Sequence, residues 1–339
     1  MKLIDTKNAI GHVLCHDLTR IIPGKMKDAQ FRKGHIVTAE DIPILLSMGK
    51  EQLYILELDE NRVHENDAAQ FLVDLLINDN MSKSEVKEGK IELTATTDGL
   101  FSVNVKKLNA VNSIDNIAIA TRRGNVAVKK GDKLAAMRII PLTIEKEKLE
   151  QVMLTLNGEK ILEVTPFLNM RLGLVTTGNE IFSGRIKDSF SPVVIEKLSN
   201  FGVFPIAHEI SNDKTENIVL AVKKVKDAGA NLVVCTGGMS VDPDDRTPAA
   251  IKQSGAKIIS YGAPVFPGAM LLIGYFDDGI PILGLPGCVM YAKATLFDAL
   301  LPRVLAGKRI AREDITELGN GGLCLSCEQC DFPDCPFAH

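Results

Sequence analysis

The chain has 339 residues and a formal net charge of −4 at pH 7. This length is enough for roughly two domains, each with its own core. Lys and Arg are spread along the chain without a basic stripe, which argues against a nucleic-acid partner. The longest uncharged runs, 261–276 and 279–292, are shorter than a membrane span and are broken by Pro and Gly. Because residues 1–20 also lack the pattern of a secretory signal, we expect a cytoplasmic protein with no membrane partner.

Residues 1–80 have the pattern of a small α/β segment. Thr38 can cap a helix that ends at Gly49, and a strand is expected at 52–58. Apolar residues then recur at helical spacing between 68 and 76, which predicts a second helix.

Short, alternating apolar runs fill residues 90–141 and are separated by Asp-Gly, Gly-Asn and Gly-Asp turns. This pattern predicts a β-rich module over residues 81–150. The run LFSVNVKKL, residues 100–108, is assigned to strand within it. The charged stretch 145–150 is expected to be a solvated helix or connector.

Strands alternate with amphipathic helices from Arg171 onward. The strands are almost continuously apolar, which is typical of a parallel sheet covered on both faces. We therefore predict an α/β fold with a three-layer α/β/α arrangement and a mostly parallel sheet over residues 165–310. Its last helix is expected to run from about 289 to 305.

Three glycine turns end three of these strands, in the segments TTGNE at 176–180, CTGGMS at 235–240 and GLPGC at 284–288. In a parallel sheet all three would lie along one edge, where exposed backbone amides attract anions. One such turn alone is explained by the tight connection from strand to helix. Three turns at one edge indicate a phosphate site.

Acidic residues accompany these turns. Each of Asp188, Asp213 and Asp245, taken alone, is equally well explained as a helix N-cap. Together the acids favour a divalent cation that bridges carboxylate and phosphate, as Mg²⁺ does. The acidic residues are Glu180, Asp188, Asp213, Asp242, Asp244 and Asp245.

The segment TGGMSVDPDDRTPAAI, residues 236–251, resembles the signature of molybdopterin-binding proteins. The segments TTGNEI, DSFSPVVIEKLSNFG, FPGAMLLIGY and GIPILGLPG match that family in the same order, so the resemblance covers roughly 171–307. The segment FRKGHIVTAEDIPILLSMGKEQLYILE is similar to part of the molybdopterin molybdenumtransferase chain. The resemblance implies a pterin-binding domain that acts in molybdenum or tungsten cofactor biosynthesis.

By position, the resemblance implies that Asp245, Asp213 and Glu180 are the reactive acids and that Asp213 and Asp245 hold Mg²⁺. The ligand would be molybdopterin or its adenylyl form, and molybdate would replace the adenylyl group at the dithiolene. A homo-oligomer is implied, with a molybdoenzyme or a cofactor-assembly protein as partner. The positions that match the cofactor-binding turns are Thr177, Gly178, Ser189, Thr236, Gly237, Gly238, Ser240, Pro286 and Gly287.

The chain departs from the family at three points. Asn179 stands where the family has Asp, Cys288 and Val289 replace Asn-Pro, and the cysteine tail stands where a small β domain follows in the relatives. These departures favour an alternative, a non-catalytic carrier or sensor of the cofactor. A dinucleotide-binding protein is a weaker alternative, because no G-x-G-x-x-G follows a strand.

Residues 320–339 form a cysteine-rich tail with the spacing C-x2-C-x2-C-x4-C-P. Bacterial ferredoxin runs have three residues before the last cysteine, and a structural zinc held by four thiolates fits the count equally well. We expect Cys324, Cys327, Cys330 and Cys335 to ligate a metal, zinc or an iron–sulfur cluster. The remaining cysteines are interpreted as small buried residues, and His208 and the other internal histidines as solvated or capping side chains.

Overall fold

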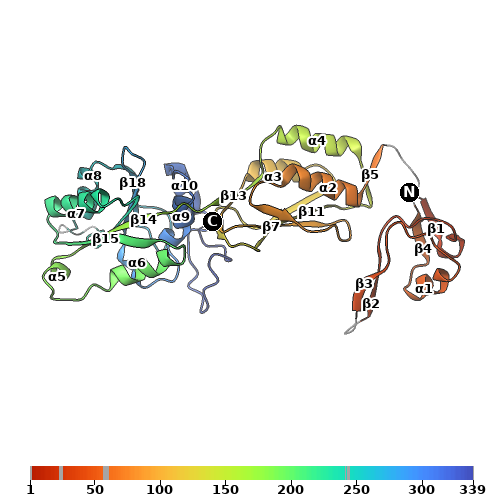
Figure 1. Ribbon diagram of the computed structural model, residues 1–339, viewed down its shortest axis with the longest axis horizontal. Coiled ribbons are helices and arrows are strands. Elements are labelled where there is room, and N and C mark those ends of the chain that lie inside the picture. The colour runs from red at the N-terminus through yellow and green to blue at the C-terminus, as the bar shows by residue number, and fades with distance from the viewer. Residues whose placement is uncertain (1, 23–25, 56–60, 241, 243–244, 339) are drawn as a thin grey trace. The chain divides into compact units, whose positions relative to one another are not determined.

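The structure is a computed structural model that describes residues 2–22, 26–55, 61–240, 242 and 245–338 (Figure 1). The chain divides into two compact units. Unit 1 comprises Met1–Thr96, Val103–Arg122 and Lys130–Glu163, and unit 2 comprises Thr97–Ser102, Arg123–Lys129 and Val164–His339. The finer boundaries at 1–80, 81–150, 165–310 and 320–339 stay predictions.

The first part of unit 1 contains two antiparallel strand pairs and a short helix. Strand β1 (Lys2–Asp5) pairs with β4 (Gln52–Ile55), and β2 (Leu18–Ile22) pairs with β3 (Met26–Phe31). Helix α1 (Asp41–Ser47) buries Leu45 in a small core. The predicted helix is present, but Glu40 and not Thr38 stands at its N-cap. The strand predicted at 52–58 is present over Gln52–Ile55, and 56–58 lie outside the described residues.

The rest of unit 1 is a four-stranded antiparallel sheet in the order β6-β7-β11-β9, with a short pair of β5 and β12. Three helices accompany it, and α2 matches the helix predicted near residues 68–76. The elements are β5 (Arg62–His64), α2 (Glu65–Leu76), β6 (Met81–Lys83), β7 (Ile91–Ala95), α3 (Val105–Asn112), β9 (Ile117–Thr121), β11 (Lys133–Ile139), β12 (Thr143–Glu145) and α4 (Lys146–Leu156).

The prediction of strand through residues 100–108 is wrong in its second half. Strand β8 (Gly99–Val103) ends at Val103, and the next residue, Asn104, is the N-cap of α3. The Asn104 side chain accepts a hydrogen bond from the Lys107 N–H (3.2 Å) and so caps the helix. Strand β8 itself lies in a three-stranded sheet with β10 (Val126–Val128) and β13 (Leu162–Pro166).

The main sheet of unit 2 has six strands in the order β15-β14-β16-β19-β18-β17. The first four are mutually parallel, and β18 runs antiparallel to both of its neighbours, which confirms the mostly parallel sheet. The strands are β14 (Arg171–Thr177), β15 (Phe204–Ser211), β16 (Leu232–Thr236), β17 (Lys257–Tyr261), β18 (Leu272–Tyr275) and β19 (Pro281–Leu285).

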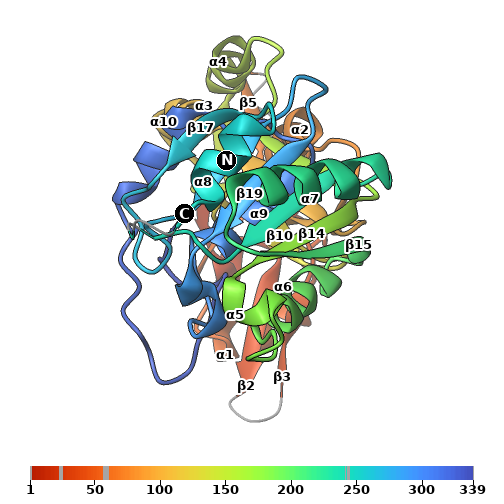
Figure 2. The ribbon, with the colours of Figure 1, turned by 90° about the vertical axis from the view of Figure 1, so that its left-hand side faces the viewer.

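Helices cover both faces of this sheet, so the domain has three layers (Figure 2). On one face Val175 and Val233 pack against α7 (Thr215–Asp227) and α8 (Thr247–Gln253). On the other face Leu174 and Val234 belong to the larger core, which includes α6 (Phe190–Ser199), α9 (Leu296–Leu305) and α10 (Arg312–Thr316). The α/β/α prediction is confirmed.

The last long helix begins later than the predicted residue 289. A 3-10 turn, Gly287–Met290, follows β19, and α9 begins only at Leu296. Thr295 and Asp298 form a capping box, with the Thr295 N–H and Oγ1 both donating to Asp298 Oδ2 (2.8 and 2.9 Å). This cap sets the start of the helix. Within the described part of the chain, no helix is long and apolar enough to cross a membrane.

Candidate functional site

The three glycine turns follow strand ends that are in register. Thr176 of β14 lies opposite Thr236 of β16, and Thr236 lies opposite Leu285 of β19. Because these strands are parallel, the turns that follow them lie along one edge of the sheet, which we call the carboxyl edge. Ser211, the last residue of β15, pairs with Thr177 and brings the Asp213 loop to the same edge.

Gly237 and Gly238 require glycine for steric reasons. Their φ angles are +83° and +55°, in the region that side chains disfavour. A Cβ added to Gly237 would lie 2.3 Å from the Thr177 carbonyl oxygen, and one on Gly238 would lie 2.8 Å from Thr247 Oγ1. The turn after β16 therefore packs directly against the turn after β14, and the two form one backbone surface.

Three buried threonines belong to this surface. Thr177 Oγ1 and Thr247 Oγ1 share a hydrogen bond of 3.0 Å, which ties the end of β14 to the start of α8. Thr236 is fully buried, and its Oγ1 has no hydrogen-bond partner among the described residues. An unpaired buried hydroxyl costs free energy unless a bound group completes it.

Asp245 holds the loop that follows Gly238. The Ser240 N–H donates to Asp245 Oδ2 (2.8 Å), so this carboxylate closes the loop and is not the N-cap of α8. The Tyr261 hydroxyl donates to the Met239 and Ser240 carbonyl oxygens (both 3.2 Å). Partial burial and the negative charge of Asp245 raise the pKa of Tyr261. Asp242 is exposed on the same loop, whereas Asp244 lies outside the described residues.

Asp213 caps a different helix from the one that its position in the sequence suggests. Its Oδ2 accepts a hydrogen bond from the Asn179 N–H (2.8 Å), and its own N–H donates to Asn179 Oδ1 (3.3 Å). Helix α7 begins at Thr215 without a side-chain cap. Asp213 therefore joins the β15 loop to the β14 turn at the first turn of α5 (Asn179–Phe182). Glu180, in the same helix, is exposed, and its carboxylate lies beside Gly178.

A polar cluster of Thr176, Asp188, Ser191 and His208 lies at the end of β14 on the α6 side. Thr176 Oγ1 is 2.7 Å from Ser191 Oγ and 2.9 Å from His208 Nε2. Asp188 Oδ1 accepts hydrogen bonds from the N–H groups of Phe190 and Ser191 (2.9 and 3.0 Å), so the Asp188 side chain caps α6. Ser189 stands at the N-cap position itself, but its side chain makes no capping hydrogen bond. Burial opposes ionisation of Asp188, but these hydrogen bonds outweigh it and lower its pKa.

His208 is exposed, as expected for a solvated histidine, and its Nε2 also has specific partners at the end of β14. Side chains alternate between the two faces of β15, and this alternation places the His208 side chain toward α6. The position of His208 within the predicted strand was therefore a signal available in the sequence. The same atom, Nε2, approaches Thr176, Ser191 and, at 3.9 Å, Asp188. A serine triad needs the serine and the acid on different ring nitrogens. The cluster consequently fits a positioning role for the end of β14.

The third turn carries Pro286 and Gly287 directly after β19. A Cβ on Gly287 would meet nothing within 4 Å, so this turn leaves open space beside its backbone. Cys288 follows, and partial burial raises the pKa of its thiol. Cys235, inside β16, is fully buried, as predicted, and this burial raises the pKa of its thiol to about 12.

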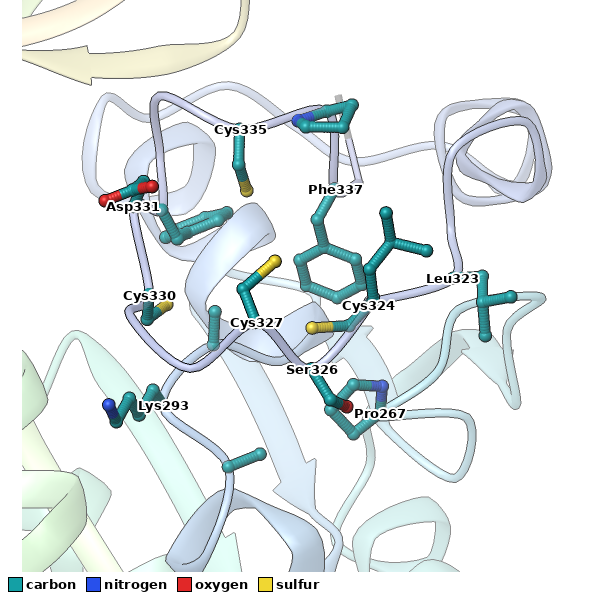
Figure 3. A pocket seen from close by; sticks show the side chains of 15 residues that line it. Pro267, Lys293, Leu323, Cys324, Ser326, Cys327, Cys330, Asp331, Cys335 and Phe337 are labelled. Atoms are coloured by element: carbon teal, nitrogen blue, oxygen red, sulfur yellow. The ribbon is translucent and has the colours of Figure 1, made fainter.

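The four tail cysteines line one cavity of about 280 Å³ (Figure 3). Apolar side chains, among them Leu323, Phe332 and Phe337, form much of its wall, and Lys293 also lines it. Within the residues that the structure describes, no three His, Cys, Asp or Glu side chains form a group that could hold a single metal ion. The structure therefore brings the four thiols to one cavity but forms no closed single-ion site.

Comparison with known families identifies the larger domain. Residues 173–306 match the family described as "Probable molybdopterin binding domain". Over these residues the domain is similar to that family. Residues 3–57 match a second family, described only as a domain of unknown function, DUF8806.

Several individual proteins are similar to parts of the chain. A molybdopterin molybdenumtransferase from Synechococcus elongatus is 26% identical over 230 residues, which is 63% of this chain and 56% of that protein. A CinA-like protein from Mycobacterium avium is 33% identical over 81 residues, 24% of this chain and 18% of that one. The chain thus spans little more than half the length of the first relative and much less of the second. A tungsten cofactor synthesizing protein, MoaB from Pyrococcus furiosus, has 18% identity and a TM-score of 0.35, covering 42% of this chain and 98% of that one.

Proposed function

We propose that the molybdopterin-binding domain binds molybdopterin or its adenylyl form at the carboxyl edge and inserts molybdate with the help of Mg²⁺. The observation that carries the proposal is the packing of the Gly237–Gly238 turn against the Thr177 turn beside Asp245. Backbone amides and a carboxylate lie together there. This combination suits a phosphate that is neutralised by a cation.

In this proposal the terminal phosphate lies against the backbone of the three turns. The amides at Gly237 and Gly287 would supply fixed donors that need no reorganisation as charge develops on the phosphoryl oxygens. The Gly178 N–H donates to the Ser211 carbonyl (3.1 Å), so Gly178 would shape the first turn and not donate to the phosphate. The buried Thr236 hydroxyl is a further donor at the end of β16. The Thr177–Thr247 hydrogen bond keeps the first two turns in contact.

The acids of the edge suit Mg²⁺, which prefers a few carboxylate oxygens together with substrate phosphates. Asp245 uses Oδ2 for the Ser240 N–H, and in the described part of the chain its Oδ1 has no hydrogen-bond partner. Asp213 contributes a second carboxylate from the other side of β14. When bound, the cation would polarise the phosphoanhydride. Asp245 and Asp213 hold the loops in place around that ligand, and Glu180 lies next to the Gly178 turn.

The test is conversion of adenylyl-molybdopterin to the metal-loaded cofactor with molybdate and Mg²⁺. Asp245→Asn keeps an oxygen for the Ser240 N–H but removes the charge. We expect it to reduce turnover by about 100-fold, the scale of several kcal/mol of lost charge stabilisation. Asp242→Asn makes the same charge change at an exposed position on the same loop and should leave turnover unchanged. Equal turnover of Asp245→Asn and the wild type would refute the assigned role.

A second candidate function is that of a carrier or sensor that binds the cofactor without turnover. Asn179 favours it, since this residue exchanges hydrogen bonds with Asp213 where the family has a further carboxylate. This candidate predicts tight binding of the finished cofactor and no conversion of the adenylyl form. If the protein is a carrier, the Asn179→Asp variant should show no turnover of the adenylyl form, like the wild type. If it is an insertion enzyme, the variant and the wild type should differ in turnover rate.

We also propose that unit 2 forms a homo-oligomer through the edge strand β15 and passes the cofactor to a molybdoenzyme or an assembly protein in the cytoplasm. Phe204, Ile206 and Ile210 alternate along β15 and are exposed. Exposed apolar side chains grouped on an edge strand are typical of an interaction surface. Light scattering of the wild type and of Ile206→Asp checks this, and a monomeric wild type would contradict it.

The final element of the proposal is that Cys324, Cys327, Cys330 and Cys335 ligate a metal centre. Its support is their common cavity, and both zinc and iron–sulfur chemistry use four thiolates.

A further inference from the structure

We infer that the tail binds a polynuclear iron–sulfur cluster, of the [4Fe–4S] class, in the cavity between Cys324, Cys327, Cys330 and Cys335. The inference rests on the proposed metal ligation by the tail and specifies the metal centre. Figure 3 shows the four sulfur atoms directed toward one space from different parts of the loop. The residues belong to a single segment, and unit 2 holds both ends of that segment.

The tail is a closed loop, although it contains little regular secondary structure. At its start the Phe266 N–H donates to the Gly322 carbonyl (2.7 Å), and the Cys324 N–H donates to the Phe266 carbonyl (2.8 Å). At its end the Ala338 N–H donates back to the Gly321 carbonyl (3.0 Å), and Phe337 is buried in the main core. This closure returns Cys335 to the side of Cys324. The four-residue spacer before Cys335 therefore serves one site, unlike the shorter ferredoxin spacer that leads to a second cluster.

The size of the cavity favours a cluster over a single ion. Zinc lies about 2.3 Å from each thiolate, so four sulfurs around one zinc are roughly 3.8 Å apart and enclose no further space. Here the thiols line a cavity of about 280 Å³. A water molecule occupies about 30 Å³ of liquid, so this space is many times larger than an ion requires. An inorganic core of four irons and four sulfides is a ligand on that scale.

The wall of the cavity suits such a cluster chemically. Phe332 and Phe337 supply apolar surface to its wall, and their rings pack edge to face at 6.1 Å, whereas Leu323 is 66% exposed at its rim. A cluster with four thiolates carries net negative charge, and Lys293 lines the cavity with a positive one; Asp331 also lines it and opposes this effect. Solvent exposure and nearby charge are two of the features by which proteins set the potential of a cluster.

The cavity lies beside the loops that extend the carboxyl edge. Pro267 comes from the loop after β17, and Ala292 and Lys293 come from the loop that begins with the Pro286–Gly287 turn after β19. Four residues, 288–291, separate Gly287 from Ala292. The cluster site is thus connected by one short segment to a turn of the proposed pterin site.

The experiment is metal and sulfide analysis of the full chain purified without air, combined with visible absorption and electron paramagnetic resonance after reduction. We expect about four irons and four acid-labile sulfides per chain, with a broad visible absorption that bleaches on reduction. Cys327→Ala and Cys330→Ala should each lose most of the iron. Both residues are exposed, so these changes remove no core packing. Cys288→Ser changes a cysteine outside the tail and should retain the iron.

The outcomes separate the two proposals. One zinc per chain that is lost in Cys327→Ala would overturn the cluster and leave metal ligation intact. A chain with neither metal, even after anaerobic reconstitution with iron and sulfide, would overturn both. Iron that persists in both tail variants would also overturn the inference, because another site would then hold it.

Discussion

The carboxyl edge and the cysteine tail are two sites built in opposite ways within one unit. At the carboxyl edge, parallel strands hold Thr176, Thr236 and Leu285 in register, and backbone amides form the surface. In the tail, four side chains from an irregular loop line a cavity, and hydrogen bonds at the two ends of the loop close it. The first site depends on backbone geometry and the second on side-chain identity. The two sites should therefore respond differently to mutation.

The largest effect is expected from Gly237→Ala. The added Cβ would lie 2.3 Å from the Thr177 carbonyl oxygen at a φ of +83°. Backbone strain of about 1–3 kcal/mol and overpacking of about the same size should lower the free energy of unfolding by roughly 2–5 kcal/mol. Urea denaturation measures this change. Gly287→Ala is the control, because its Cβ meets nothing, and it should be as stable as the wild type. Equal stability of the two variants would show that the turns do not pack as described.

The comparison predicts a local effect when the metal of the tail is removed. Oxidative removal of iron, followed by chelation, should leave the six-stranded sheet folded, because only Cys324 and Cys335 of the four tail cysteines pack against its core, and both are only partly buried. The exposed residues 327–331 should then be cleaved faster by a protease than in the loaded protein. Mass spectrometry of the fragments locates the cleavage. Unfolding of the whole unit on metal removal would contradict the separation of the two sites.

The Thr177–Thr247 pair allows a side-chain test within the backbone-defined site. Thr177→Val leaves the fully buried Thr247 hydroxyl without its partner and should cost about 1–3 kcal/mol. The double variant, with Thr247→Val as well, should recover part of this loss, since neither polar group is then left unpaired. Strictly additive losses in a thermal or urea double-mutant cycle would mean that the two hydroxyls are not coupled.

The smallest effect concerns Asp188 and is visible only as a pH dependence. Its pKa is lowered in the folded state, so its charge stabilises the fold above the unfolded pKa of about 3.9 and this contribution is lost as pH falls through the folded pKa. Asp188→Asn keeps the cap on α6 but has no charge to lose. The wild type should exceed the variant in stability by about 1 kcal/mol at pH 7, and the difference should disappear in acid. A constant difference between pH 7 and pH 2 would contradict the shift.

Much of the larger domain could be predicted from the sequence because its signals are local and repeated. Continuous apolar strands such as 232–236 are typical of a sheet buried on both faces, and the glycine turns mark the strand ends. The sequence predicts the start of α9 too early, because the apolar residues before Leu296 also fit a helical pattern. The Thr295–Asp298 capping box, which the structure shows, fixes the true start. The sequence does not predict helix α3, because in a β-rich run Asn104 cannot be told apart from an ordinary polar residue of a strand.

The side-chain partners at the site were less predictable. Asp213 was expected to cap α7, yet its carboxylate accepts the Asn179 N–H, which is 34 residues away in the chain. His208 has no partner near it in sequence and meets Thr176 only through strand pairing. Such contacts depend on tertiary register, which no local pattern contains. The spacing of the tail cysteines predicts metal ligation, but it does not predict the cavity from which we infer a cluster.

Hydrogen–deuterium exchange of the full chain with and without molybdopterin tests the central claim most directly. The account predicts that the ligand slows exchange in the peptides containing Gly178, Gly237 and Gly287, the three turns of the carboxyl edge, while the sheet of β6, β7, β9 and β11 exchanges as before. Protection confined to another part of the chain, or bound molybdopterin with no protection of the Gly237–Gly238 turn, would contradict it.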